Sequence, residues 1–253
     1  MYALILAGGR GKRLEPHTDD ANKSMLRLQG KPLIQYSLES ALKAGAEKIV
    51  VVVGYRAEDI INCFGNSFHG TPVRYVIQYE RNGLVHAIEC ARDAMDGADF
   101  TLFLADEVLS HTRHDEMLRE FYSQDLFAIC GVVKANDRTH IRKTYGLLAD
   151  EASRRIYRLI EKPRVPVNGV MGTGNCVLRG EIFEYIERTP LNVERGEKEL
   201  PDLIQCAVDE GLLVKYFDIG DGYVNVNTPD DIHIAEQVYE AKLEWPRNRA
   251  RSI

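Results

Sequence analysis

The stretch ALILAGGRGKRL, residues 3–14, decides the fold class of this 253-residue chain. It begins with the apolar run Ala3–Leu6, whose length and composition predict a buried strand. Three glycines then occupy four positions, and three basic residues accompany them: Gly8, Gly9 and Gly11, with Arg10, Lys12 and Arg13. Because glycine lets backbone N–H groups surround a phosphate, the stretch predicts a strand that ends in an anion-binding loop.

Two common nucleotide-binding patterns do not fit this loop. A P-loop needs Ser or Thr after its Gly-Lys pair, but Arg13 follows Gly11 and Lys12 here. A dinucleotide-binding fingerprint needs a third glycine at the position of Leu14. From these residues alone, a glycine turn without a ligand is an open alternative.

The first half of the chain alternates between predicted strands and helices. The predicted strands, which are apolar on both faces, are residues 3–6, 49–53, 73–77, 100–104 and 127–133. The predicted helices are residues 32–44, 57–64, 85–95 and 115–122. This alternation predicts an α/β fold with a mainly parallel sheet and helices on both faces, and it places ligands beyond the carboxyl ends of the strands.

The second half of the chain has a different pattern of polar, Pro and Gly residues. Residues 134–143 are polar, two short strands are predicted around 146–148 and 156–161, and residues 163–174 are rich in Pro and Gly, so we expect a small β insert that helps to form the site. Helices at 181–187 and 200–210, a strand at 214–217 and a last helix capped by Thr228 follow. We predict one Rossmann-like domain, residues 1–245, with a mixed, mainly parallel central sheet, and a basic C-terminal tail, residues 246–253.

Composition and charge exclude several classes of protein. The net charge of −6 gives no general attraction to nucleic acid or to an anionic membrane. No apolar run approaches the roughly 18 to 20 residues that span a bilayer, and the N-terminus lacks the basic start of a signal peptide. The five cysteines are scattered singly, so we expect reduced core residues. These features predict a soluble cytoplasmic protein.

A longer pattern extends from the glycine loop. Residues 6–18, 23–26 and 30–36 together resemble the signature of the sugar-1-phosphate nucleotidylyltransferases. That family joins a nucleoside triphosphate to a sugar 1-phosphate and releases pyrophosphate, on a single Rossmann-like domain. The resemblance implies that the first strand end and the glycine loop bind the nucleotide, through Leu6, Ala7, Gly8, Gly9 and Gly11. It also implies that Arg13 binds the leaving pyrophosphate and Lys23 the α-phosphate.

Two departures from the family pattern flank the implied catalytic lysine. Asn22 and Ser24 stand where the family usually has prolines. We expect these substitutions to loosen the loop while leaving Lys23 in place.

A second match lies directly after the third predicted strand. Gln78, followed five residues later by Gly83 before a helix, resembles the segment with which thymidylyl and uridylyl members read a pyrimidine base. The resemblance therefore favours dTTP or UTP. A surface glutamine followed by a glycine at a helix start is the alternative from the residues alone.

The resemblance also implies a Mg²⁺ site. Asp106 follows the fourth predicted strand, where the family has a metal-binding aspartate, with Ala105 in place of the usual glycine. Asn225 aligns with the second family ligand, which is commonly Asp, so we expect a neutral and weaker ligand there. A hard cation held by few protein oxygens and several phosphate oxygens suits Mg²⁺.

A third match points to the sugar phosphate. In Glu161-Lys162-Pro163, the resemblance implies that Glu161 accepts bonds from sugar hydroxyls and that Lys162 pairs with the phosphate. Two flanking stretches would complete a sugar-binding β insert with small residues and backbone groups, at Gly146 and at Gly174 and Asn175.

The implied reaction explains the absence of a protein nucleophile from the sequence pattern. In-line attack by a sugar phosphate on the α-phosphorus brings two polyanions together, so catalysis consists mainly of positioning and cationic stabilisation. We therefore expect an enzyme with a nucleoside triphosphate and a sugar 1-phosphate as ligands, forming a homo-oligomer as relatives commonly do.

Several alternatives stay open. A cytidylyl or guanylyl transferase could act on a cyclitol, polyol or phosphonate phosphate. A non-catalytic subunit could sense nucleotide sugars, although Arg13, Lys23 and Asp106 disfavour it, and a glycosyltransferase would not need the glycine loop. His111 and His114 before a helix are expected to be a solvated cap rather than a zinc site.

Overall fold

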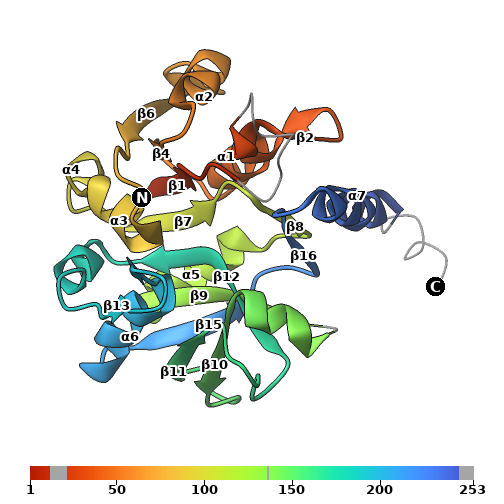
Figure 1. Cartoon of the computed structure of the whole chain (residues 1–253). Coiled ribbons are helices and arrows are strands. Elements are labelled where there is room, and N and C mark those ends of the chain that lie inside the picture. Colours follow the sequence, from red (N-terminus) through yellow and green to blue (C-terminus); the bar gives the residue numbers. More distant parts are fainter. Residues whose placement is uncertain (12–21, 136, 245–253) are drawn as a thin grey trace.

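The computed structural model describes residues 1–11, 22–135 and 137–244 (Figure 1). Arg13 and the predicted tail, residues 246–253, lie outside the described residues. Within the described part, a ten-stranded sheet has the strand order β11-β10-β12-β7-β1-β4-β6-β5, and β9 pairs with both β12 and β15. The strands are β1 (Tyr2–Ala7), β4 (Lys48–Val53), β5 (Ser67–Phe68), β6 (Thr71–Ile77), β7 (Phe100–Leu104), β9 (Ala128–Lys134), β10 (Tyr145–Ala149), β11 (Ile156–Glu161), β12 (Val170–Leu178) and β15 (Val214–Asp218).

Four neighbouring strands, β7, β1, β4 and β6, run parallel. Their side chains alternate between two buried faces, as the apolar runs predicted. In β1, for example, Leu4 and Leu6 belong to one core cluster, while Ala3, Ile5 and Ala7 belong to the other. The parallel α/β fold class is therefore confirmed for this half of the molecule.

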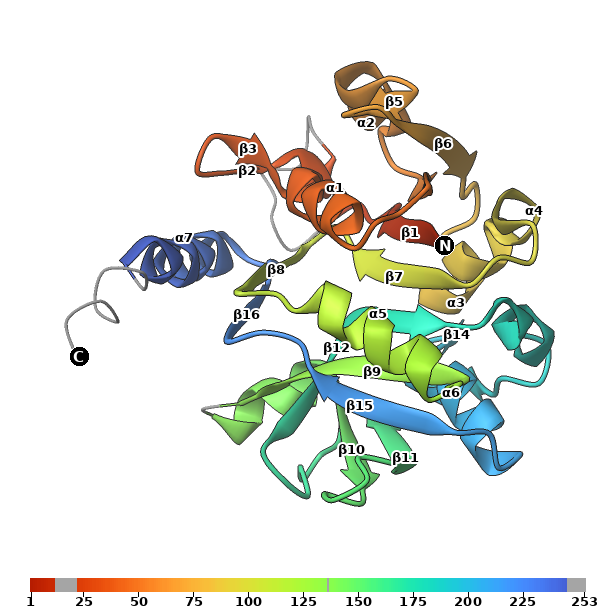
Figure 2. The ribbon, with the colours of Figure 1, turned by 180° about the vertical axis from the view of Figure 1, so that it is seen from behind.

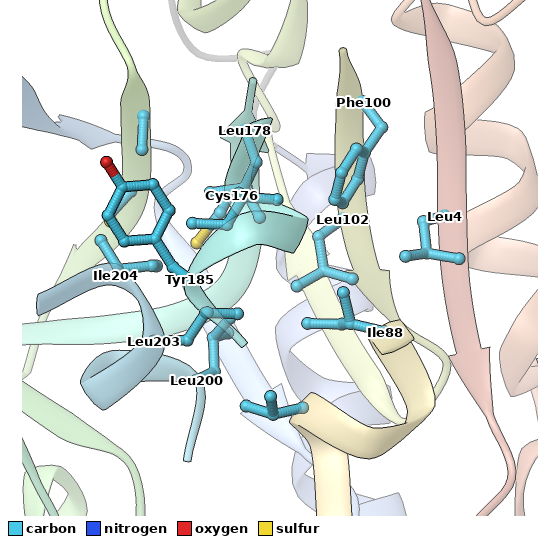
Figure 3. Close-up of a cluster of buried hydrophobic side chains, with 14 of the residues drawn as sticks. Leu4, Ile88, Phe100, Leu102, Cys176, Leu178, Tyr185, Leu200, Leu203 and Ile204 are labelled. Carbon is cyan, nitrogen blue, oxygen red and sulfur yellow. The ribbon is translucent and has the colours of Figure 1, made fainter. Parts of the chain in front are cut away.

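Helices cover both faces of the sheet. One face carries α1 (Leu33–Lys43), α2 (Ala57–Phe64) and α5 (His114–Ser123), and Figure 2 shows α1 and α5 in front of the strands. The other face carries α3 (Gly83–Cys90), α4 (Arg92–Met95) and α6 (Leu200–Asp209). Figure 3 shows Ile88 of α3 and Leu203 of α6 packed against strand residues such as Leu102. The single helix predicted over residues 85–95 is divided at Ala91 into α3 and α4.

The second half contains a long strand that the sequence patterns did not predict. β12 runs antiparallel to β7, β9 and β10, and its register shifts between Gly172 and Cys176. Its first residues fall within the Pro/Gly-rich stretch 163–174, whose composition gives no strand signal. The sheet is therefore mixed, because antiparallel β12 connects the parallel half to the β10–β11 pair.

Smaller elements complete the described chain. They are η2 (Lys23–Met25), β2 (Arg27–Leu28), β3 (Lys31–Pro32), η3 (Arg138–Lys143), β13 (Leu191–Asn192) and β14 (Glu197–Lys198). The predicted helix over 181–187 is instead a 3₁₀ helix, η4 (Gly180–Tyr185). None of the described helices is both long enough and apolar enough to cross a membrane.

The last helix packs on a small sheet that lies apart from the central one. β8 (Glu107–Ser110) pairs antiparallel with β16 (Gly222–Asn225), and α7 (Pro229–Glu244) lies beside both strands (Figure 1). The predicted Thr228 cap is confirmed, and it forms a capping box: the Thr228 N–H donates to Asp231 Oδ2 at 2.8 Å and the Asp231 N–H to Thr228 Oγ1 at 3.4 Å.

All five cysteines are free, and they differ in burial. Cys130 and Cys176 lie in the core, as expected. The expectation was wrong for Cys63, which is exposed on α2, and Cys90 and Cys206 are half-buried.

Candidate active site

The candidate site lies where the four parallel strands end. Loops leave β1 at Gly8, β4 at Gly54, β6 at Gln78 and β7 at Ala105. Backbone bonds join neighbouring exits: the Ala105 N–H donates to Leu6 O at 3.1 Å, and the Gln78 N–H donates to Val53 O at 2.8 Å. Carboxyl ends of parallel strands form the usual ligand-binding edge of an α/β sheet.

The glycine loop begins in close contact with this edge. Gly8 is buried, and a Cβ at its position would lie 2.8 Å from Gln78 Oε1 and 3.7 Å from the Gly54 nitrogen. A side chain at this position would therefore displace the Gln78 amide. Gly9 is exposed, Gly11 lies against the Lys23 side chain, and Leu6 and Ala7 are buried in β1.

Lys23 is held by a tightly bonded loop. The preceding Asn22 is fully buried; its Nδ2 donates to Tyr55 O at 2.6 Å and to Ala7 O at 3.3 Å, and its Oδ1 accepts from the Ser24 N–H at 2.8 Å. The expectation that Asn22 and Ser24 loosen this loop was therefore wrong. The asparagine side chain supplies hydrogen bonds to the ends of β1 and β4 that a proline could not make.

The Lys23 ammonium joins two separate segments of the chain. Its Nζ lies 2.5 Å from Asp106 Oδ2 and 3.1 Å from Asn227 Oδ1. The Lys23 side chain is 8% exposed and that of Asp106 is 26% exposed, so the ion pair is largely shielded from water. The predicted catalytic residues Lys23 and Asp106 thus lie in direct contact, although 83 positions separate them.

Oxygen atoms near this ammonium could hold a divalent cation. Asp106 Oδ2 and Asn227 Oδ1 both face the same positive charge, and carboxylate and amide oxygens are ligands that Mg²⁺ accepts. The predicted ligand Asn225 lies next to them, with its Oδ1 accepting from Asn227 Nδ2 at 2.6 Å. A backbone bond from the Val226 N–H to Asp106 O, 2.9 Å long, keeps the two segments together.

Asn227 was not singled out from the sequence. Residues two apart on an extended segment point to the same side, so the Asn-Val-Asn spacing of residues 225–227 was the available signal. The family resemblance implied a role for Asn225 alone, so this spacing was not used to predict Asn227.

Behind Asp106, the buried Glu107 connects the carboxyl-end edge of the parallel strands to β12. Its carboxylate accepts from the Gly174 N–H at 3.0 Å, from Asn175 Nδ2 at 2.9 Å and from the Tyr223 hydroxyl at 2.7 Å. Burial raises the pKa of Glu107 to about 7, against the lowering effect of these donors. Glu107 therefore ties together the segments that carry Asp106, Asn175 and Tyr223.

Asn175 continues this buried network to α5. Asn175 Oδ1 lies 2.9 Å from His114 Nε2, and both side chains are buried. The expectation of a solvated cap was therefore wrong for His114, whose pKa is lowered by burial. No group of three or more His, Cys, Asp or Glu side chains within the described ranges forms a metal cluster.

The predicted base-reading residues lie beside the glycine loop. Gln78 is 5% exposed, and its Nε2 donates to Gly83 O at 3.2 Å. Gly83 starts α3 with φ of 90°, a left-handed conformation that glycine adopts without strain. A Cβ at Gly83 would also lie 2.9 Å from Glu197 Oε2, so the β13–β14 hairpin closes over this helix start.

The predicted sugar-phosphate residues form a separate charged cluster. Glu161 Oε1 lies 3.2 Å from Lys162 Nζ and 3.2 Å from Arg195 Nη2, and Arg195 also pairs with Glu199 at 2.6 Å. Arg195, in the β13–β14 turn, was missed because a lone arginine in a polar loop carries no sequence signal. Gly146 is buried in β10, which pairs with the strand that ends at Glu161. Gly174 is buried in β12 and lies against Leu104 and Glu107 instead.

Comparison with known proteins agrees with this geometry. The family model described as "Nucleotidyl transferase" matches residues 2–242. The chain belongs to the nucleotidyl transferase family. The resemblance drawn from the sequence is confirmed, and with it the fold class and the assignment to nucleotidyl-transferring enzymes.

Individual relatives of the nucleotidyl transferase family are similar along most of the chain. A UTP–glucose-1-phosphate uridylyltransferase of Haloferax volcanii is 32% identical over 94% of this chain and 96% of its own length. A glucose-1-phosphate thymidylyltransferase of Streptomyces griseus is 30% identical over 83% of this chain, which spans 58% of that relative. A UDP-glucose pyrophosphorylase solved with UDP-glucose has the same fold, with a TM-score of 0.86, 22% identity, and coverage of 96% of this chain and 100% of that one.

Proposed function

We propose that this protein transfers a uridylyl or thymidylyl group from UTP or dTTP to a hexose 1-phosphate, releasing pyrophosphate and forming a nucleotide sugar. The relatives named above, which cover 94% and 83% of the chain, support this substrate class. Glucose 1-phosphate is the acceptor that both relatives' names state, and we take it as the first candidate.

One observation carries the proposal: Lys23 Nζ lies between Asp106 Oδ2 and Asn227 Oδ1 at the ligand-binding edge of the sheet. A cation and oxygen ligands for a metal thus gather beside the glycine loop. Transfer of a nucleotidyl group needs this combination, because its transition state spreads negative charge over the α-phosphate and the departing pyrophosphate.

The residues at the ligand-binding edge have separate proposed roles. Backbone N–H groups of Gly8, Gly9 and Gly11 bind the triphosphate, and Lys23 neutralises the α-phosphate. Arg13, outside the described residues, is proposed to bind the pyrophosphate. Asp106, with Asn225 and Asn227, would hold Mg²⁺, which when bound would neutralise phosphate charge and orient the α-phosphate.

The acceptor is proposed to occupy the Glu161 cluster. Glu161 would accept from sugar hydroxyls, and Lys162, with Arg195 beside it, would bind the sugar's phosphate. Gly146, on the strand beside β11, would let the sugar approach the backbone, whereas Gly174 would act indirectly because Leu104 packs where its Cβ would lie. Asn175 would act indirectly, since Glu107 and His114 already bond its amide.

The alternatives have less support. A non-catalytic sensor would not need Lys23 and Asp106 in contact beside a glycine loop. Neither of the relatives reported above is a cytidylyl or guanylyl transferase by name.

The test is Mg²⁺-dependent pyrophosphate release, measured for UTP, dTTP, CTP, GTP and ATP against glucose, galactose, mannose and N-acetylglucosamine 1-phosphates. We expect release with UTP or dTTP and one or two of these acceptors. Release confined to CTP or GTP, or none with any pair, would contradict the proposal.

A further inference from the structure

Gln78 has an amide group whose orientation the structure determines. Its Nε2 lies 3.2 Å from Gly83 O and 3.0 Å from His86 Nδ1. Its Oε1 points toward the glycine loop, 2.8 Å from where a Cβ on Gly8 would lie. The amide thus turns its nitrogen toward α3 and its oxygen toward the nucleotide loop.

The two partners on α3 require this orientation. A backbone carbonyl can only accept, so Gly83 O must face the amide nitrogen rather than the amide oxygen. The second N–H of the same nitrogen has His86 Nδ1 as its acceptor. With both N–H groups engaged, Oε1 is the part of Gln78 that a ligand in the loop would meet.

His86 is itself held in the accepting form. When Nδ1 accepts, the ring proton is on Nε2, and Nε2 lies 3.8 Å from Cys90 Sγ, one helical turn further along α3. Burial raises the pKa of the Cys90 thiol, so the sulfur stays uncharged and can serve as a weak acceptor. A chain Cys90–His86–Gln78 therefore runs from α3 to the loop.

We propose that His86 is a positioning residue for base specificity: together with Gly83 O it holds Gln78 with Oε1 toward the nucleotide, so that the site takes a base with an N–H donor at N3 and rejects cytosine. The inference rests on the proposed function, in which Gln78 contacts the base. Uracil and thymine carry a proton on N3, whereas N3 of cytosine is an acceptor and would face another acceptor. A site built around one hydrogen-bonding pattern discriminates strongly against its opposite.

Three substitutions separate this role from a packing role. His86→Phe keeps a ring but removes one of the two acceptors that hold the amide nitrogen. Only Gly83 O then opposes the rotation of Gln78 that presents its NH₂ group to cytosine. His86→Asn retains an oxygen near the position of Nδ1 and is the matched control. His86→Ala provides a second acceptor-free protein if the larger phenylalanine disturbs folding, which circular dichroism would reveal.

The measurement is the dissociation constant of UTP and of CTP, with Mg²⁺, by isothermal titration calorimetry, alongside pyrophosphate release. We expect His86→Phe and His86→Ala to lower the UTP-over-CTP affinity ratio by about tenfold or more, a modest part of the discrimination that such sites reach. His86→Asn should stay within about threefold of the natural protein on the same scale.

The outcomes are distinguishable. An unchanged ratio in both acceptor-free proteins, or an equal loss in His86→Asn, would overturn the inference. Because the ratio is measured by binding, a protein that binds UTP but transfers nothing would refute the proposed function while still testing His86.

Discussion

Two lysines proposed to bind phosphate lie in contrasting surroundings. The Lys23 side chain is 8% exposed and contacts Asp106 and Asn227. The Lys162 side chain is 45% exposed, has a backbone φ of 42°, and pairs with its neighbour Glu161 at 3.2 Å. Exposed ion pairs contribute little to stability, whereas shielded pairs are fixed in place. Under the proposed function, the contrast would give the nucleotide a preformed centre around Lys23 and the acceptor an open, adaptable surface around Lys162.

The difference follows from how each lysine is built into the chain. Asn22 bonds the Lys23 loop to the ends of β1 and β4, so its geometry follows the parallel sheet. Lys162 follows the end of β11, a strand that pairs only with β10 among the described strands. An edge strand has fewer constraints, and we expect its residues to adjust when the sugar phosphate binds.

Removing a charge from the preformed centre should give the largest effect. We expect Asp106→Asn to lower kcat by roughly 10² to 10³, the scale for losing one group that stabilises charge in the transition state. Asp115→Asn is the matched control, since Asp115 forms an exposed pair with Arg119 and should leave kcat unchanged. Steady-state pyrophosphate release measures both. If Asp106→Asn kept near-normal turnover, Asp106 would have no part in binding the metal.

The next largest effect is expected on stability at Glu107, which connects the segment of Asp106 to β12. Glu107→Ala leaves three donors on Gly174, Asn175 and Tyr223 without their acceptor. Leaving these buried donors without an acceptor should lower the free energy of unfolding by about 2 to 3 kcal/mol. Glu107→Gln should lose less, because its oxygen can accept from Gly174 and Asn175 while its NH₂ donates to the Tyr223 oxygen.

Urea unfolding at one pH checks the Glu107 prediction. Equal destabilisation by alanine and glutamine would mean that the negative charge, rather than the hydrogen bonds, holds the junction together.

A smaller effect is expected on the open side. Lys162→Ala should raise the KM for the sugar 1-phosphate about tenfold, equivalent to about 1.4 kcal/mol, with kcat changed less than about threefold. Lys31→Ala is a close control, because Lys31 is 40% exposed and pairs with Glu39 at 2.8 Å. A fall in kcat with an unchanged KM would place Lys162 with the preformed centre and end the contrast.

The same contrast explains what could be predicted from the sequence. Gln78 and Asp106 were singled out through the family resemblance, and the apolar runs placed Gly8, Gln78 and Asp106 at or just after the ends of predicted strands. Arg195 and Glu107 were missed because their partners, Glu161 and Gly174, are distant along the chain. Only the antiparallel packing of β12, hidden in a Pro/Gly-rich stretch, brings Glu107 to Gly174.

The smallest predicted effect is on the pH dependence of stability at His114. It tests whether water is excluded from the buried His114–Asn175–Glu107 network behind the preformed centre. Burial lowers the pKa of His114 below its ordinary value of 6.5, so the unfolded chain takes up a proton at that position more readily than the folded protein does. Stability should therefore fall as the pH decreases below 6.5. The slope from this residue is at most about 1.4 kcal/mol per pH unit.

The test compares unfolding free energies of the natural protein and His114→Gln between pH 5 and 7.5. Glutamine can still donate to Asn175 but takes up no proton. The unfolding free energy of His114→Gln minus that of the natural protein should therefore increase as the pH falls. Glu107 acts in the opposite direction, since its raised pKa makes stability decline as the pH rises from 4.5 toward 7, but it does so in both proteins and cancels in the difference. His233→Gln, at a side chain that is 74% exposed, serves as the surface control. If the curve of unfolding free energy against pH for His114→Gln ran parallel to that of the natural protein, water would reach His114, and the centre would be less shielded than its contacts imply.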